Sequence, residues 1–202
     1  MCEIKKATFG RLPVYLKFLK ELDSDVVYVS SSLIAKALGL GDVQVKKDLN
    51  SISGKGRPKF GYDRLALISD LEKFIIKNTK TKVVLVGVGK LGKALLDYNG
   101  FQKFGLSITA AFDSDLTKVG KSEQNKSILP IDKLGQYCKE NGVTIGIIAV
   151  PAIYAQQICD VLVSSGVKAI WNFAPVKLSV PEGIVLKQED LSLSLAYLNL
   201  QI

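Results

Sequence analysis

Residues 82–92 read KVVLVGVGKLG, and this stretch decides the fold. A run of β-branched and apolar residues, Val83–Val88, predicts a strand that is buried on both faces. The run passes directly into a G-x-G-x-x-G sequence formed by Gly87, Gly89 and Gly92, and the following KALLDY segment predicts a helix. In such a turn the first glycine permits the tight bend, the second lets a pyrophosphate approach the backbone, and the third allows helix and strand to pack closely.

A second apolar segment, Ser107–Phe112 (SITAAF), predicts the next strand, and it ends in Asp113, 21 residues beyond Gly92. A dinucleotide site has a carboxylate at about this distance, where it binds the adenosine ribose hydroxyls and disfavours a 2′-phosphate. We therefore predict that the chain binds NAD or NADH, with NADP less favoured. A strand–helix–strand unit that has a glycine turn but no ligand is the alternative. The predicted nucleotide residues here are Gly87, Val88, Gly89, Lys90, Leu91, Gly92 and Asp113.

The charge of the chain is unevenly distributed. The 202 residues have a formal net charge of +8. Residues 1–80 carry 15 Lys and Arg against 9 Asp and Glu, whereas residues 81–202 carry 12 against 10. All three arginines, Arg11, Arg57 and Arg64, lie in the first part. A basic N-terminal part joined to a nearly neutral nucleotide-binding part suggests that the former contacts a polyanion.

Composition also disfavours several classes of protein. No apolar run reaches the roughly 18–20 residues of a membrane span, and the N-terminus lacks the apolar core of a signal peptide. The three cysteines, Cys2, Cys138 and Cys159, are widely spaced and odd in number, which argues against a disulfide framework or a metal cluster. The sequence contains no histidine, the commonest general acid–base and metal ligand. We expect a cytoplasmic, reduced protein without a metal.

The N-terminal part has the pattern of a helix-turn-helix. Leucines and a tyrosine at spacings of three and four predict a helix over Phe9–Leu22, with Pro13 in its first turn. Two shorter helices are expected at 32–38 and, with Asp42 as N-cap, at Val43–Ile52, joined by a glycine-containing turn. Val45, Leu49 and Ile52 form an inward stripe of the second short helix. Polar residues on its other side suit the major groove of DNA, where Gln can pair with adenine: Gln44, Lys46, Lys47, Asn50 and Ser51.

The segment at 53–62, SGKGRPKFGY, contains too many glycines for a helix and fits a β-hairpin wing that reaches the DNA backbone or minor groove. Its basic residues Lys55, Arg57 and Lys59 are predicted DNA contacts, although a solvated basic loop is an equal alternative. A helix is expected over Tyr62–Ile76, and the polar segment 77–81 is the expected linker.

From residue 82 onward predicted strands and helices alternate, which is the pattern of a doubly wound parallel α/β sheet. We expect helices at Asp132–Glu140 and Ile153–Ser165 and strands at Val143–Val150 and Ala169–Phe173. The C-terminal segment, DLSLSLAYLNLQI, fits either a helix or a strand. It is too apolar to be a solvated tail, so either a partner subunit or its own domain should cover it.

Several longer motifs together resemble the Rex-type redox-sensing transcriptional repressors over nearly the whole chain. They are RLPVYLKFL (11–19), VQVKKDL (43–49), FGY (60–62), VGVGKLGKALLDYNGF (86–101), AAFDSD (110–115), IAVPA (148–152), NFAPVKLSVPEG (172–183) and DLS (190–192). Lys90 departs from the Asn that is usual in this glycine turn, and the segment after the second short helix lacks the usual aromatic residues.

The resemblance implies a winged-helix domain (1–78), a Rossmann domain (79–188) and a dimerisation helix exchanged between protomers (189–202). It implies a homodimer that binds inverted-repeat operator DNA and releases it when NADH binds. Residues implied at the nicotinamide are Val150, Pro151, Asn172, Phe173, Ala174 and Pro175. Residues implied in a network between DNA-binding domain, nucleotide and partner subunit are Arg11, Tyr98, Asp190 and Leu191.

Two other functions compete with a nucleotide-controlled repressor. A small NAD-dependent oxidoreductase would need a proton-relay group, and none stands out in a chain without histidine. A nucleotide- or CoA-binding subunit would leave the basic N-terminal part unexplained. We therefore expect a DNA-binding protein rather than an enzyme.

Overall fold

The computed structural model describes residues 6–76, 81–120 and 126–202. The chain divides into two compact units, Met1–Thr79 and Lys80–Ile202. The division falls in the segment that the sequence predicts as a linker, of which residues 77–80 lie outside the described part. Cys2 also lies outside it. Within the described residues, no helix is both long enough and apolar enough to span a bilayer.

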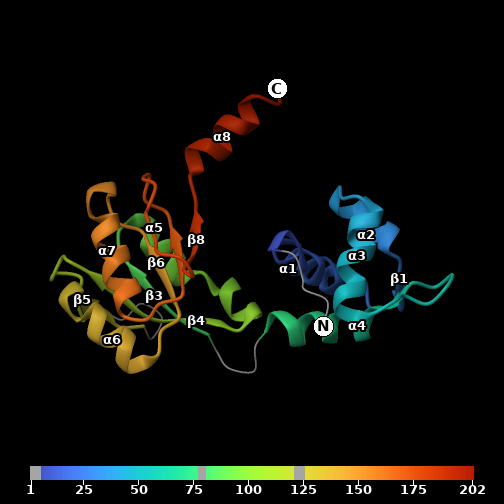
Figure 1. Cartoon of the computed structure of the whole chain (residues 1–202), viewed down its shortest axis with the longest axis horizontal. Coiled ribbons are helices and arrows are strands. Elements are labelled where there is room, and N and C mark those ends of the chain that lie inside the picture. Colours follow the sequence, from blue (N-terminus) through green and yellow to red (C-terminus); the bar gives the residue numbers. More distant parts are fainter. Residues whose placement is uncertain (1–5, 77–80, 121–125) are drawn as a thin grey trace. The chain divides into compact units, whose positions relative to one another are not determined.

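Over residues 6–76 the N-terminal unit has four helices and one two-stranded sheet (Figure 1). Its core is formed by apolar side chains that are almost completely buried, among them Leu12, Leu16, Leu19, Val45 and Leu67. The elements in chain order are α1 (Lys6–Glu21), β1 (Tyr28–Val29), α2 (Ser31–Leu38), α3 (Asp42–Ser53), β2 (Tyr62–Asp63) and α4 (Arg64–Ile75).

Helices α2 and α3 form the predicted helix-turn-helix. Ser30 caps α2 by accepting a hydrogen bond from the Leu33 backbone N–H at 3.1 Å, and Gly39 ends the helix in the left-handed conformation at φ 64°. The predicted N-cap of α3 was wrong. Gly41 occupies the cap, and Asp42 lies in the first turn, where a negative charge is favourable beside the positive end of the helix dipole.

The prediction that Pro13 lies in the first turn of α1 was also wrong. The helix begins at Lys6, so Pro13 lies well inside it. A proline there removes one backbone hydrogen bond and costs about 3 kcal/mol. The helix continues because Leu12, Tyr15, Leu16 and Leu19 on its inner face are at most 1% exposed, and their burial offsets that cost.

The wing differs from the predicted hairpin at 53–62. Strand β2 pairs with β1, through Tyr28↔Asp63 and Val29↔Tyr62, instead of with the segment just before it. Between α3 and β2, only an isolated bridge joins Arg57 and Gly61 around a tight turn. Gly61 cannot be replaced there, because a Cβ would overlap the Val29 carbonyl oxygen. The predicted helix at 62–76 accordingly begins later, at Arg64, with Asp63 as its N-cap.

The C-terminal unit contains a six-stranded parallel sheet in the order β5-β4-β3-β6-β7-β8 (Figure 1). The chain thus runs outward through β3, β4 and β5, then crosses back to β6 beside β3 and runs through β6, β7 and β8 in the other direction. This is the order of winding in a doubly wound nucleotide-binding fold. The strands are β3 (Thr81–Val86), β4 (Leu106–Asp113), β5 (Ile128–Pro130), β6 (Ile145–Ile148), β7 (Ala169–Asn172) and β8 (Val185–Gln188).

Helices cover both faces of this sheet. One core joins the strands to α6 (Leu134–Asn141) and α7 (Ala152–Ser164), and the other joins them to α5 (Lys90–Asp97). Two short 3-10 helices, η1 (Asn99–Phe104) and η2 (Ile131–Lys133), also belong to this unit. The predicted helix at 132–140 is therefore η2 followed by α6, and the strand predicted over 143–150 is shorter at both ends. Strands β5 and β8 were not predicted.

The ambiguous C-terminal segment forms a helix, α8 (Leu191–Asn199). Asp190 caps it by accepting hydrogen bonds from the backbone N–H groups of Ser192 and Leu193 at 2.9 and 3.3 Å. Every residue of α8 is exposed, including leucines that are 60–69% exposed. The described part of its own domain therefore does not cover this helix, contrary to one of the two alternatives.

Candidate functional site

The glycine turn connects β3 to α5 through residues 87–89 alone. Gly87 has φ +95°, and a Cβ there would overlap the Ala149 carbonyl oxygen on the neighbouring strand. Gly92 lies in the first turn of α5, where a Cβ would overlap the Gly87 carbonyl oxygen. Gly89 differs from both, because nothing lies within 4 Å of the position of its Cβ. Two glycines are therefore required by the fold, whereas the third leaves open space beside the backbone.

A cleft of about 590 Å³ lies at the carboxyl ends of β3, β4 and β6. In an open parallel sheet this is where ligands bind, because the chain reverses its direction of winding between β3 and β6. Five of the predicted nucleotide residues line it, namely Gly87, Gly89, Asp113, Val150 and Pro151. The sequence did not single out several other lining residues, among them Ser114, Asp115, Lys118, Tyr154 and Gln157.

Asp113 is buried at the end of β4 and bonds to the glycine turn. Its carboxylate accepts hydrogen bonds from the backbone N–H groups of Val88 at 2.7 Å and Asp115 at 2.9 Å, and from Lys118 Nζ at 3.0 Å. Burial would raise the pKa of the carboxyl group, but these hydrogen bonds and the nearby ammonium outweigh it and lower the pKa. The group is thus an ionised acceptor at the cleft.

The other predicted residues of the turn differ in their exposure to solvent. The side chain of Val88 is buried, whereas Lys90 and Leu91 are exposed in the first turn of α5. The N-terminus of this helix offers unpaired backbone N–H groups and the positive end of the helix dipole to an anion.

The segment 172–175 does not line the cleft as found. Asn172 is completely buried, and its side chain binds its own loop, donating to the carbonyl oxygens of Ala174 and Val176 and accepting from the Ala174 N–H. Ala174 is buried, Phe173 packs against Trp171 with ring centroids 4.6 Å apart, and Pro175 is exposed. Asn172 thus fixes the shape of this loop, and its contact with a nicotinamide stays a prediction.

Thiol and metal chemistry find no support in the described residues. Cys138 and Cys159 are buried, and burial raises the pKa of Cys138 to about 11. A thiol with so high a pKa is protonated and unreactive at neutral pH. The described chain contains no group of three or more His, Cys, Asp or Glu that could hold a metal ion.

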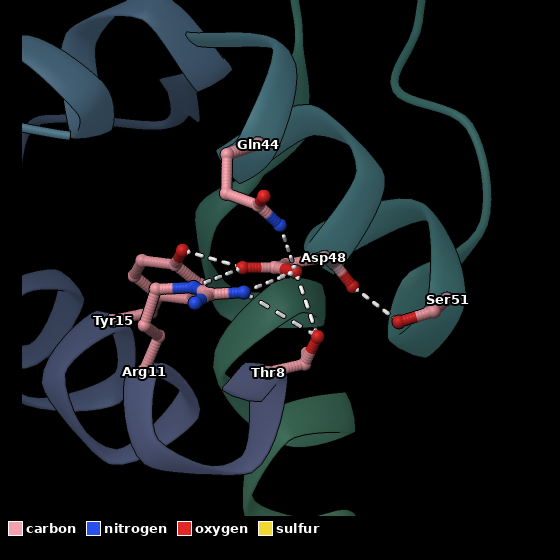
Figure 2. Close-up of polar contacts among 6 residues, drawn as sticks. All are labelled: Thr8, Arg11, Tyr15, Gln44, Asp48 and Ser51. Carbon is pink, nitrogen blue, oxygen red and sulfur yellow. Dashed lines mark hydrogen bonds and ion pairs between the residues drawn. The ribbon is translucent and has the colours of Figure 1, made fainter. Parts of the chain in front are cut away.

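In the N-terminal unit a buried carboxylate joins α1 to α3 (Figure 2). Asp48, on α3, is 2% exposed and accepts hydrogen bonds from three residues of α1, namely Thr8, Arg11 and Tyr15. Arg11 binds it with two nitrogens, Nε at 2.6 Å and Nη2 at 3.0 Å. Gln44 of α3 donates from Nε2 at 2.9 Å. We call these five residues the Asp48 centre.

The sequence analysis missed this centre, although a signal was present. Asp48 lies three residues after Val45 and one before Leu49, within the stripe that was predicted to face inward. A carboxylate in such a stripe needs buried donors, because an unpaired charge in the core is costly. Thr8, Arg11 and Tyr15 recur at spacings of three and four, which places them on one face of α1.

The predicted DNA contacts fall into two groups. Lys46 and Lys47 of α3 are exposed, as are Lys55, Arg57 and Lys59 after it. The polar residues of α3 have partners within the unit: Gln44 binds Asp48, Ser51 donates to the Asp48 carbonyl oxygen at 2.6 Å, and Asn50 accepts from the Tyr62 hydroxyl at 2.8 Å.

The four residues of the implied network also have local contacts. Arg11 belongs to the Asp48 centre, Tyr98 packs edge-on against Phe101, and Asp190 caps α8, in which Leu191 is 66% exposed. Their contact with one another stays a prediction.

Comparison with known proteins agrees with this division of the chain. A family model described as a putative DNA-binding protein N-terminus matches residues 3–50, and one described as a CoA-binding domain matches residues 78–176. The redox-sensing transcriptional repressor Rex of Carboxydothermus hydrogenoformans is 42% identical over 99% of this chain and 97% of its own. That of Treponema denticola is 41% identical over 95% and 92%.

The chain belongs to the Rex family.

Solved structures of the Rex-family repressor RSP agree in fold. RSP in complex with β-NAD⁺ and operator DNA is 31% identical, with a TM-score of 0.91 over 100% of this chain and 93% of that one. RSP in complex with β-NADH is 30% identical, with a TM-score of 0.88 over 100% and 95%. The predicted fold class, a winged helix-turn-helix followed by a Rossmann sheet, is confirmed by these Rex structures.

The two kinds of glycine in the turn give a matched pair of variants. Gly92→Ala should destabilise the C-terminal unit by about 1–3 kcal/mol, because the new methyl group overlaps a backbone carbonyl. Gly89→Ala should leave the melting temperature nearly unchanged but weaken NADH binding at least about tenfold, since its methyl group occupies the space that a pyrophosphate needs. Thermal unfolding and NADH fluorescence titration measure the two effects. Unchanged NADH affinity in a folded Gly89→Ala protein would contradict the assignment of the turn.

The Asp48 centre should make the N-terminal unit sensitive to acid. Burial raises the pKa of Asp48, but hydrogen bonds from Arg11, Tyr15, Thr8 and Gln44 outweigh this and lower it. The stabilisation is therefore complete above the unfolded pKa, about 4, and is lost as the pH falls through the lower folded value. Asp48→Asn should cost about 3 kcal/mol at neutral pH, and this difference should shrink in acid.

Urea unfolding followed by circular dichroism, from neutral pH into the acid range, measures this difference. Glu21→Gln is the control, because its ion pair with Lys17, at 3.9 Å, is exposed on both sides and should contribute little. If the free energies of unfolding of the wild type and of Asp48→Asn changed with pH in parallel, Asp48 would not be the source of the acid sensitivity.

Proposed function

We propose that this chain represses transcription by binding operator DNA through its N-terminal unit and releases that DNA when NADH binds its C-terminal unit. The observation that carries the proposal is the presence, in one chain, of a dinucleotide cleft at the switch point of a Rossmann sheet and of a basic helix-turn-helix. The solved relative contains NAD⁺ and operator DNA in the same complex.

In the proposed nucleotide site, the pyrophosphate lies against Gly87 and Gly89 at the N-terminus of α5, and Gly92 lets that helix approach. The open space at Gly89 supports this placement, because it leaves the backbone accessible to a phosphate. Asp113 accepts the ribose hydroxyls, and Val150 and Pro151 lie at the nicotinamide end. Residues 172–175 lie at the carboxyl end of β7, the neighbour of β6 in the sheet, and we propose that they border the nicotinamide.

In the proposed DNA interface, α3 enters the major groove and the segment 54–61 contacts the backbone. Five exposed cations support this: Lys46 and Lys47 on α3, and Lys55, Arg57 and Lys59 beyond it. Such contacts position a protein on the duplex without reading its sequence. Sequence reading would fall to Gln44, Asn50 and Ser51.

A second copy of the chain is the proposed cover for α8. Exposed leucines on all sides of a helix are unfavourable in water, and a homodimer would bury them twice by one symmetric contact. Exchange of α8 would carry Asp190 and Leu191 to the partner, where they could join Tyr98 and Arg11. A dimer would also match the inverted repeat of an operator. Because its target is operator DNA, we place the protein in the cytoplasm.

We propose that the nucleotide acts here as a signal and not as the cofactor of an enzyme. The titratable side chains at the ribose end of the cleft bind one another, since Lys118 lies 3.0 Å from Asp113 and 3.6 Å from Asp115. The relatives are named as transcriptional repressors. This reading leaves a role for the basic unit, which an oxidoreductase or a CoA-binding subunit would not.

Gel-shift titration tests the proposal directly. With the operator duplex of the solved relative as probe, NADH should lower the DNA affinity of this chain at least about tenfold, whereas NAD⁺ should change it little, because only a ligand with different affinities for the two states can shift them. A Lys46→Ala, Lys47→Ala double variant should bind NADH normally but DNA weakly, with a salt dependence reduced by about one unit per lysine. If NADH binds but leaves the DNA affinity unchanged, the proposed control is wrong.

Asp113 should also set the preference between NADH and NADPH. Its buried carboxylate would repel a 2′-phosphate, so NADPH should bind about tenfold or more weakly than NADH. Asp113→Asn should reduce the ratio of the NADPH dissociation constant to the NADH dissociation constant. Asp115→Asn, at the exposed neighbour, is the control and should keep most of this preference for NADH. Both ratios come from fluorescence titrations, and equal affinities in the wild type would remove this role from Asp113.

A further inference from the structure

The side chain of Gln44 is exposed on α3, yet its amide is held in place from inside the unit. Nε2 donates to Oδ1 of Asp48 at 2.9 Å, across one turn of the same helix. Figure 2 shows the amide nitrogen directed at the Asp48 carboxylate. An exposed residue on a DNA-facing helix is thus connected to the buried link between α1 and α3.

The chemistry of Asp48 determines which end of the amide faces inward. An ionised carboxylate only accepts hydrogen bonds. Oδ1 also accepts from Thr8 and from Arg11 Nη2, both at 3.0 Å, while Oδ2 accepts from Arg11 Nε and from the Tyr15 hydroxyl. With donors on all sides, the carboxylate has no place for a proton. The Gln44 carbonyl oxygen would be repelled here, so the nitrogen must face Asp48.

The opposite end of the amide is therefore an acceptor. Among the described residues none donates a hydrogen bond to Oε1 of Gln44, and the side chain is exposed. In the major groove, adenine and cytosine each offer an exocyclic amine, whereas guanine and thymine offer only acceptors and, for thymine, a methyl group. An outward carbonyl oxygen suits the first two bases and is mismatched with the others.

We propose that Asp48 is a specificity-determining residue of the DNA interface that acts through Gln44. By fixing the amide with its oxygen outward, it makes α3 select a base with a major-groove amine at one position of the operator. The inference rests on the proposed DNA-binding function and adds the chemistry of one contact. Asp48 itself does not touch DNA. It is a positioning residue, held in turn by Thr8, Arg11 and Tyr15 of α1.

This role differs from a merely structural one in what it affects. If the Asp48 centre only held α1 against α3, its loss would weaken binding to all DNA sequences alike. If it orients Gln44, its loss changes the preference for one base pair and leaves the other positions as they were. The base preference at each position therefore distinguishes the two roles.

Selection of duplexes from a randomised pool by the full-length protein without NADH provides this measurement. The wild type first gives the preferred site, and Gln44→Met then identifies the position that Gln44 reads. At that position the wild type should prefer the two base pairs that carry the amine on one strand about three- to tenfold over the two that carry it on the other strand, the range of one net hydrogen bond. Gln44→Met and Asp48→Ala should both bring this ratio close to one.

Arg64→Met is the control. It removes a hydrogen bond from Arg64 Nη1 to the Leu22 carbonyl oxygen, at 2.8 Å and outside the Asp48 centre, and keeps the bond between Gln44 and Asp48, so it should lower stability while the base preference remains. Circular dichroism shows whether Asp48→Ala is folded. If it is not, Asp48→Leu, which fills a similar space but cannot accept a hydrogen bond, takes its place in the selection, while Gln44→Met, at an exposed residue, tests whether Gln44 reads a base.

Several outcomes would overturn the inference. They are a shared preference for base pairs whose amines lie on opposite strands, such as A·T together with T·A, a preference that is unchanged at every position in Gln44→Met, or an unchanged preference in a folded Asp48→Ala or Asp48→Leu protein. Failure of the wild type to enrich any sequence is a different result, which would count against the proposed DNA-binding function itself.

Discussion

The structure of the C-terminal unit depends on one close approach between backbones. Helix α5 can begin only three residues after β3 ends because neither Gly87 nor Gly92 has a Cβ, and a methyl group at either would overlap a carbonyl oxygen. This approach directs the N–H groups of the helix N-terminus at the cleft between β3 and β6. Gly89 is free of such contacts, so the fold does not require its small size, which we propose serves the ligand. The turn thus separates what folding requires from what binding requires.

The N-terminal unit depends on a polar interaction of similar importance. The recognition helix α3 is joined to α1 by the Asp48 carboxylate, which receives five hydrogen bonds. Buried carboxylates of this kind fix geometry more than they add stability, because desolvation offsets much of the attraction. Arg11, which the family resemblance implies in a network with the nucleotide and the partner subunit, donates two of these five hydrogen bonds. A change at Arg11 would therefore alter the position of α3 and of its exposed lysines.

Much of the fold could be predicted from the sequence, because strong local signals coincided with buried apolar patterns. The sequence alone predicted the turn at 87–92, the acid at Asp113, the two helices of the helix-turn-helix and the alternation of strands and helices. The errors arose where tertiary packing outweighs local preference: Pro13 lies inside α1, and β2 pairs with β1 instead of forming a hairpin with its neighbour. Of the site, five cleft residues were foreseen. Lys118 lies only five residues beyond Asp113, but their ion pair depends on how the chain folds after β4. The position of Asp48 in the inward stripe indicated buried partners, but which residues supply them depends on the packing of α1 against α3.

The proposed function requires reciprocal coupling between the two ligands, since a nucleotide that controls DNA binding must itself be controlled by DNA. The most direct measurement is the NADH dissociation constant of the full-length protein, determined by fluorescence with and without saturating operator duplex. We predict that DNA weakens NADH binding by the same factor by which NADH weakens DNA binding, about tenfold or more. An NADH affinity that is identical with and without DNA would contradict it.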